Sequence, residues 1–290
     1  MNLLQDLMSP EMAFMRCALL VGLLGGISMG IVGTMVVTRR ITSIAGAIAH
    51  AVLGGIGAAL YMQRVWHVSW AQPLLGAAVG AVTAALLIGL VSLYARERED
   101  TVISAVWAFG MSIGLLFLDR TPGYVDFQGY LFGNILLLSQ ADVWWTAALD
   151  VVILVPTVLF FNQLLAMSFD STFAELRGVR VRLLYLLLLV GTALTIVLMV
   201  YVVGIILLIA LLSLPAAVAG CFARRLRTMM MLAVLFCWLF VGSGLVASYA
   251  WKMPSGPVIV LFAISVYLLS STVKWAVGKY YGKKADKLCR

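Results

Sequence analysis

Apolar runs of about twenty residues recur along the whole of this 290-residue chain, and they limit the folds open to it. The segment 17–38 is an example, because it contains no charged side chain. A helix needs about 20 apolar residues to cross the hydrocarbon core of a bilayer. The runs are continuous, whereas the strands of a membrane barrel alternate apolar and polar residues. We therefore expect an all-α polytopic membrane protein.

The composition leaves no room for a large soluble domain. Hydrophobic residues make up 63% of the chain and charged residues only 11%, whereas a soluble domain carries about a quarter of charged residues. We expect residues 1–290 to form a single transmembrane domain. The net charge of the chain is +8. The lysines and arginines that cause it lie mostly in short loops and in the basic tail 279–290, as the positive-inside rule predicts. Membrane lipid is the expected surrounding, and nucleic acid is not an expected partner.

The hydropathy pattern predicts about eight to nine transmembrane helices. The expected spans are 13–37, 42–63, 71–94, 102–118, 141–166, 183–201, 204–222, 229–250 and 256–275. An apolar segment at about 128–139 is too short to cross alone. We expect it to form a broken or re-entrant helix, which a membrane protein tolerates only when it is buried in protein or lines a cavity.

Arginine and lysine clusters set the expected orientation. They fall in the segments 39–40, 96–98, 177–182, 224–227 and 279–290. The positive-inside rule places all of these in the cytoplasm. Nine crossings satisfy the rule with the N-terminus outside and the C-terminus inside.

His50 is an ionisable residue at an unusual depth. It lies ten residues beyond Arg40 in an uncharged stretch, which corresponds to about 15 Å along a helix. Ionisable groups at such depth are costly and often mark function. Neutral imidazole binds Zn, Mn or Fe, so His50 is a candidate ligand or gate on a metal path. The alternative is a neutral histidine that is hydrogen-bonded within the bundle.

Asp150 is the other ionisable residue deep within an expected span, some ten residues from its start. It is either a carboxylate on the substrate path or a buried structural acceptor. The structural alternative is favoured, because no residue at helical spacing completes a site around it.

The chain becomes polar between residues 167 and 182. Asp170 or Ser171 can cap a short helix there, and Gly178 can end it. We expect a short cytoplasmic docking helix at about 168–180, with an ordinary amphipathic loop as the alternative.

No enzyme motif accompanies these residues. The sequence has no Walker A motif, no H-E-x-x-H and no G-x-S-x-G. A transport subunit is therefore favoured over an intramembrane enzyme.

Six ordered segments between about residues 30 and 275 carry a family resemblance. They are 39–55, 100–104, 130–136, 169–179, 203–219 and 254–261. Examples are Tyr130-Leu-Phe-Gly-Asn-Ile-Leu and Phe169-Asp-Ser-Thr-Phe-Ala-Glu-Leu-Arg-Gly-Val. Together they resemble the permease subunits of bacterial metal-ion ABC transporters, the zinc/manganese/iron class.

The resemblance implies a type II ABC importer-like permease in the bacterial inner membrane. Its partners would be a second permease (homodimer or heterodimer), two ATP-binding subunits and an extracytoplasmic metal-binding protein. ATP hydrolysis would occur in the partner, and this chain would bind no cofactor. The cargo would be Zn or Mn, with Fe as a further option, on a path lined by His50, with Asp150 as a second element. The residues expected to couple to the ATPase are Asp170, Phe173, Ala174, Glu175, Gly178 and Val179.

Two departures from the family pattern remain. Gly46 stands where the family usually has a carboxylate, and Lys252 stands where it often has an acid. A partner permease could supply the acids, His50 and backbone groups could bind metal weakly, or the cargo could differ. A permease for a chelated metal and a non-ABC secondary carrier are therefore alternatives.

Overall fold

The computed structural model describes residues 13–94, 98–123, 129, 131, 133 and 139–288. These residues form helices and turns, with no strand among them. The helices are α2 (Ala13–Thr38), α3 (Thr42–Val65), α4 (Pro73–Tyr94), α5 (Glu99–Arg120), α7 (Gln140–Leu159), α8 (Phe161–Phe169), α9 (Ser171–Leu176), α10 (Val181–Val203), α11 (Ile205–Phe222), α12 (Leu226–Trp251) and α13 (Ser255–Leu288). Within the described part, nine helices are long and apolar enough to span a membrane, so the expected polytopic fold is confirmed.

The fifth expected span, 141–166, differs from the prediction. It is divided at Phe160 into α7 and α8. Pro156 has no N–H to donate to the preceding turn, so the end of α7 is weakened. Helix α8 then buries Leu164 and Met167 against the bundle. The prediction of one continuous helix over 141–166 was therefore wrong.

Most of the expected re-entrant segment, 128–139, lies outside the described residues. Gly133 is described, with a positive φ of 73°. Its backbone lies against the carbonyl of Val203, at the break between α10 and α11, so that a Cβ at this position would collide with that carbonyl. Glycine is therefore required here both by conformation and by space.

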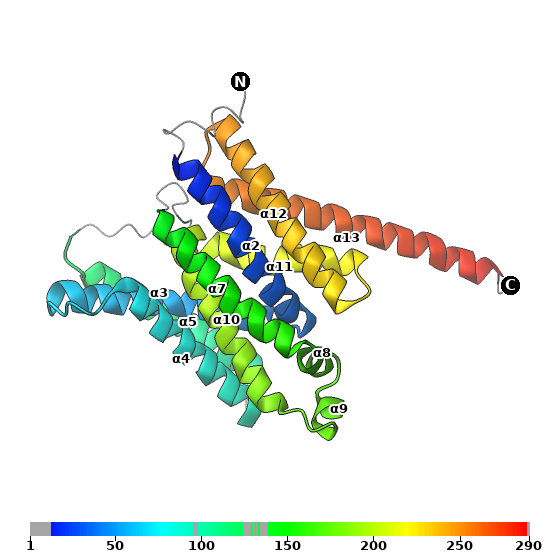
Figure 1. Cartoon of the computed structure of the whole chain (residues 1–290), viewed down its shortest axis with the longest axis horizontal. Helices are drawn as coiled ribbons and strands as arrows, with labels where there is room; N and C mark the ends of the chain where they lie inside the picture. Colours follow the sequence, from blue (N-terminus) through cyan, green and yellow to red (C-terminus); the bar gives the residue numbers. More distant parts are fainter. Residues whose placement is uncertain are drawn as a thin grey trace.

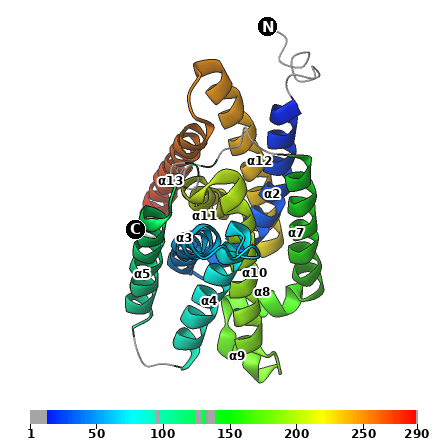
Figure 2. The same cartoon turned by 90° about the vertical axis from the view of Figure 1, so that its left-hand side faces the viewer.

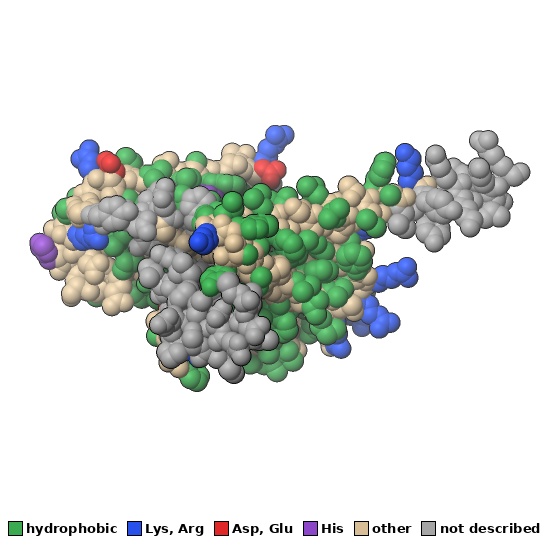
Figure 3. All heavy atoms as spheres, turned by 90° about the horizontal axis from the view of Figure 1, so that it is seen from above, with side chains coloured by type: hydrophobic (Ala, Val, Ile, Leu, Met, Phe, Trp, Pro, Cys, Tyr) green, Lys and Arg blue, Asp and Glu red, His purple; other side chains and the backbone are tan. Residues whose placement is uncertain are grey.

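The helices pack in two groups that α10 joins (Figure 1). Helix α3 packs against α4 and α5, and Figure 2 shows it end-on beside them. Helix α2 packs against α7, α11 and α12. Helix α10 contacts both α4 and α2. Much of the described surface in Figure 3 is hydrophobic with few charged side chains, as lipid contact requires.

Glycines allow α3 to approach both of its neighbours closely. Gly54 lies against Gly110 of α5, and Gly55 lies against Gly76 of α4. Small residues let membrane helices pack without a hydrophobic driving force between them. Helix α3, which carries His50, is therefore fixed between two other helices.

Replacing Gly55 by valine is expected to lower the free energy of unfolding by about 1–3 kcal/mol, because overpacking forces helices apart. A Cβ at Gly55 would collide with the Gly76 carbonyl oxygen, whereas a Cβ at Gly242 of α12 would meet no atom within 4 Å. Gly242→Val is the matched control. Thermal unfolding of the detergent-purified chain measures both, and equal midpoints for the two variants would contradict the packing argument.

The arginine-bearing segments meet at one end of the bundle. Arg39 donates from Nη1 to the Met167 carbonyl at the end of α8, at 2.8 Å, and its guanidinium lies 5.1 Å from the Tyr185 ring of α10. Arg182 lies over the Tyr94 ring at 5.5 Å, and Arg227 lies over Phe161 at 4.6 Å. These contacts bring the segments near 39, 94, 161–182 and 227 together, which is the grouping that the positive-inside rule predicts.

Candidate functional site

The ring of His50 is oriented by its own helix. Its Nδ1 lies 2.9 Å from the carbonyl oxygen of Gly46, one turn earlier in α3. A carbonyl only accepts, so Nδ1 carries the hydrogen and Nε2 of the neutral ring keeps its lone pair. Metal-binding histidines commonly use the second ring nitrogen in this way. The geometry therefore leaves Nε2 as the atom that can bind a metal.

Trp107 of α5 covers one side of this histidine. The two ring centroids are 4.5 Å apart, with an interplanar angle of 32°. A Cβ at Gly46 would lie 3.7 Å from Cζ3 of the same indole, which is an ordinary van der Waals contact. The indole thus stands beside the position where the family usually has a carboxylate. This pairing could not be predicted from the sequence, because no local pattern links residues 46 and 107.

The outer face of α5 carries a shallow hollow next to this pair. Its volume is about 520 Å³, and Ser104, Trp107, Ala108, Met111, Ser112 and Leu115 line it. Trp107 is 40% exposed. His50, which is half-buried, therefore lies behind the wall of an open hollow that contains two hydroxyl groups and a thioether.

Asp150 lies in a different interface. It is 8% exposed, and among the described residues neither carboxylate oxygen has a hydrogen-bond partner. It faces Ser28 of α2, but that hydroxyl donates to the Gly25 carbonyl at 3.2 Å. His50 packs against α5 and Asp150 packs against α2, so these contacts do not bring the two residues together in one site.

The described residues contain no group of three or more His, Cys, Asp or Glu side chains that could hold a metal ion. Lys252 is exposed in the turn between α12 and α13, with a left-handed φ of 53°. The position where the family often has an acid is thus in a surface turn.

Helix α9 lies at the arginine-bearing end of the bundle (Figures 1 and 2). Asp170 caps it by accepting a hydrogen bond from the Phe173 N–H at 2.9 Å. Gly178 follows it with a φ of 78°, and the Val179 N–H donates to the Ala174 carbonyl at 3.0 Å. The expected capping by Asp170 and the end at Gly178 are confirmed.

The exposed surface of α9 is apolar as well as charged. Phe173 is 51% exposed and Leu176 is 83% exposed, and Glu175 is also exposed. Ala174 is fully buried, so it anchors α9 to the bundle and leaves the other faces open. Leu176 was missed by the sequence analysis, although an apolar residue within a charged segment is a readable signal.

Known proteins that resemble this chain cover nearly all of it. It is 41% identical over 246 residues to the "Probable metal transport system membrane protein" of Chlamydia pneumoniae, over 84% of each protein. It is 30% identical over 276 residues to the manganese transport system membrane protein MntC of Listeria innocua, over 95% of this chain and 96% of that protein.

A solved structure shows the same fold. PsaBC from Streptococcus pneumoniae, in complex with Fab, matches with a TM-score of 0.80 and 30% identity, over 92% of this chain and 93% of that one. This match confirms the expected fold of an ABC permease. The family model described as "ABC 3 transport family" matches residues 11–274. The matched segment includes α3, α5 and α9, and the chain therefore belongs to the ABC 3 transport family.

Proposed function

We propose that this chain is the permease subunit of an ATP-driven importer for a transition-metal ion, with Mn or Zn as the first cargo and Fe as a further one. The observation that carries the proposal is the oriented imidazole of His50 at mid-span, which packs against Trp107 in the wall of the α5 hollow. The names of the Chlamydia and Listeria relatives support metal as the cargo. A second permease, two ATP-binding subunits and an extracytoplasmic metal-binding protein complete the proposed system in the bacterial inner membrane.

His50 would act as a transient ligand on the path. A neutral imidazole does not repel a cation, and the Gly46 carbonyl fixes the direction of the His50 ring. A single imidazole binds a metal less tightly than a closed four-ligand site does. A path needs binding that is strong enough to admit the ion and weak enough to release it. Asp150 is the weaker candidate for this path, because it lies against α2.

The coupling residues would connect the ATPase to His50 through a short mechanical route. Phe173 and Leu176 would offer their exposed apolar side chains to a partner at the arginine-bearing end of the bundle. Helix α9 follows α8 directly through Asp170. Arg39, in the turn before α3, holds the carbonyl of Met167 in α8. A displacement of α9 would thus reach the helix that carries His50.

ATP-dependent uptake tests this function. Proteoliposomes that contain the chain and its ATP-binding partner, supplied with the metal-binding protein, should accumulate Mn²⁺ or Zn²⁺ only when ATP is present. Accumulation that an ion gradient drives without ATP would identify a secondary carrier and overturn the proposal. Accumulation of a metal chelate in preference to the free ion would instead select the chelate alternative.

Replacing Gly46 by aspartate should make the path bind metal more tightly, by about tenfold, or ~1.4 kcal/mol. Residues 46 and 50 are one helical turn apart and share a face. The new side chain has room beside Trp107, since its Cβ would make a normal contact at 3.7 Å. The measurement is Mn²⁺ binding to the purified chain. Gly46→Asn adds the same volume without charge, and equal affinity of the two variants would contradict the prediction.

A further inference from the structure

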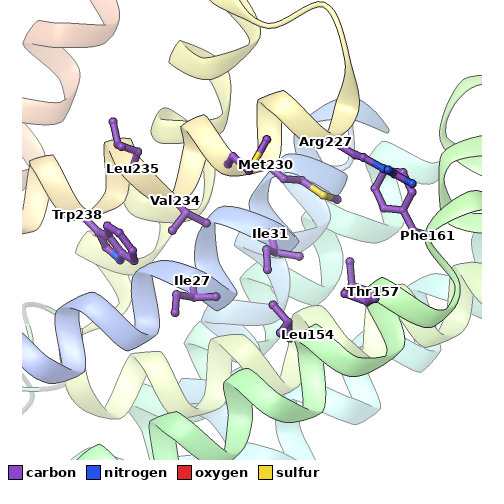
Figure 4. A pocket seen from close by; sticks show the side chains of 12 residues that line it. Ile27, Ile31, Leu154, Thr157, Phe161, Arg227, Met230, Val234, Leu235 and Trp238 are labelled. Carbon is purple, nitrogen blue, oxygen red and sulfur yellow. The ribbon is translucent and has the colours of Figure 1, made fainter.

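A large apolar groove lies away from His50, between α2, α7–α8 and α12 (Figure 4). Its volume is about 690 Å³. Its walls are mainly aliphatic and include Ile27, Ile31, Leu154 and Leu235. Its polar side chains are Thr157, Arg227 and Trp238. The Trp238 indole N–H is already occupied, because it donates to the Leu23 carbonyl at 2.7 Å. The groove therefore offers an apolar surface within the part of the chain that lies in the bilayer.

The groove has the depth of one leaflet. Arg227 and Trp238 line its two ends and lie eleven residues apart on α12 (Figure 4). This separation is about 16 Å at 1.5 Å per residue. The hydrocarbon core of a bilayer is about 30 Å thick. An acyl chain that starts at the level of Arg227 would thus run along the groove to near the middle of the membrane.

Arg227 gives the groove a charged end at the membrane surface. Its guanidinium carbon lies 4.6 Å from the centre of the Phe161 ring, so one face of the group is stacked. The in-plane N–H groups of a stacked guanidinium remain available, and they match phosphate oxygens. Arg227 is exposed, and no described carboxylate forms an ion pair with it. Arg224 and Arg225, also exposed, lie just before α12, within three residues of Arg227, and add positive charge.

We propose that this groove binds an anionic phospholipid from the leaflet on the arginine-bearing side, with its phosphate on Arg227 and one acyl chain along α2 and α12. Charge complementarity selects the headgroup, since basic residues between transmembrane helices on this side attract anionic lipids. The bound lipid would lie beside the junction of α7 and α8, which leads to α9. Lipid binding in this groove does not depend on which cargo the chain transports.

Native mass spectrometry of the full chain, purified in detergent, tests the proposal. Phosphatidylglycerol and phosphatidylcholine with the same acyl chains are the probes. The wild-type chain should retain phosphatidylglycerol at least fivefold better than phosphatidylcholine. Arg227→Gln should remove most of that preference, and Arg227→Lys should keep part of it. Arg182→Gln is the matched control, because Arg182 is also exposed and stacked on an aromatic ring but lies outside the groove.

A variant that fills the groove gives an independent readout. Leu235→Trp should lower the retention of phosphatidylglycerol, whereas Leu239→Trp, on an exposed part of α12 outside the groove, should not. The proposal is overturned if the wild-type chain shows no preference for phosphatidylglycerol. It is also overturned if Arg182→Gln weakens retention as much as Arg227→Gln does. A change of oligomeric state in Leu235→Trp with unchanged lipid retention would show that protein covers the groove and would overturn the proposal too.

Discussion

Replacing His50 by alanine is expected to lower metal uptake by about 100-fold or more, since even the loss of an outer-shell partner costs 10–100-fold at metal sites. The chain has two histidines, and His50 is the one within a span. The half-buried ring of His50 contacts Trp107 at the edge of an open hollow. Removal of the ring therefore leaves intact the glycine contacts through which α3 packs against α4 and α5. Uptake of radioactive Mn²⁺ or Zn²⁺ into proteoliposomes is the measurement.

The matched control for this variant is His67→Ala, because His67 lies in the exposed turn between α3 and α4. That variant should transport like the wild-type chain. Co-purification of the ATP-binding partner should be the same for both variants, which separates loss of transport from loss of assembly. Normal uptake by His50→Ala would mean that the metal crosses without this imidazole, and the proposed path would be abandoned.

Two substitutions at α9 should uncouple ATP hydrolysis from transport. Gly178 has a φ of 78°, which a β-branched residue adopts only with strain of about 1–3 kcal/mol, so Gly178→Val should distort the turn after α9. Glu175→Arg reverses an exposed charge on the same helix. In both variants we expect transport to fall by about tenfold, because ~1.4 kcal/mol of the free energy that ATP hydrolysis delivers to the permease would be lost. Binding of metal to the purified chain should be unchanged.

Conservative changes at the same positions provide the controls. Asparagine tolerates the left-handed region better than other residues except glycine, so Gly178→Asn should transport more than Gly178→Val. Glu175→Gln removes the charge without reversing it and should have an intermediate effect. The measurement is ATP hydrolysis in the presence and absence of the metal-loaded binding protein. If the metal-loaded binding protein still increases ATP hydrolysis in both Gly178→Val and Glu175→Arg, α9 is not the coupling helix.

Features that depend on residues close together in the chain could be predicted from the sequence, whereas contacts between helices could not. The cap at Asp170 and the end at Gly178 were predictable, because a capping bond and a positive φ involve residues within a few positions of each other. The break at Phe160 was predictable only in part, because Pro156 is visible in the sequence but the position of the break also depends on where α8 buries Leu164 and Met167. The site around His50 was predictable only in part, since its hydrogen bond to Gly46 lies within one turn but its contact with Trp107 joins two helices.

The sequence by itself determined that this is a helical membrane protein, where most of its spans begin and end, and which loops share a side. Those properties follow from the hydropathy of consecutive residues and from the charges that flank them. Only the tertiary structure decided that α3 is held between α4 and α5, that Trp107 stands beside Gly46, and that Asp150 faces α2. Helices that are apolar on every side carry no signal for their neighbours, because lipid and protein are equally apolar surroundings. Their pairing comes from the fit of small residues that are far apart in the chain, as at Gly55 and Gly76.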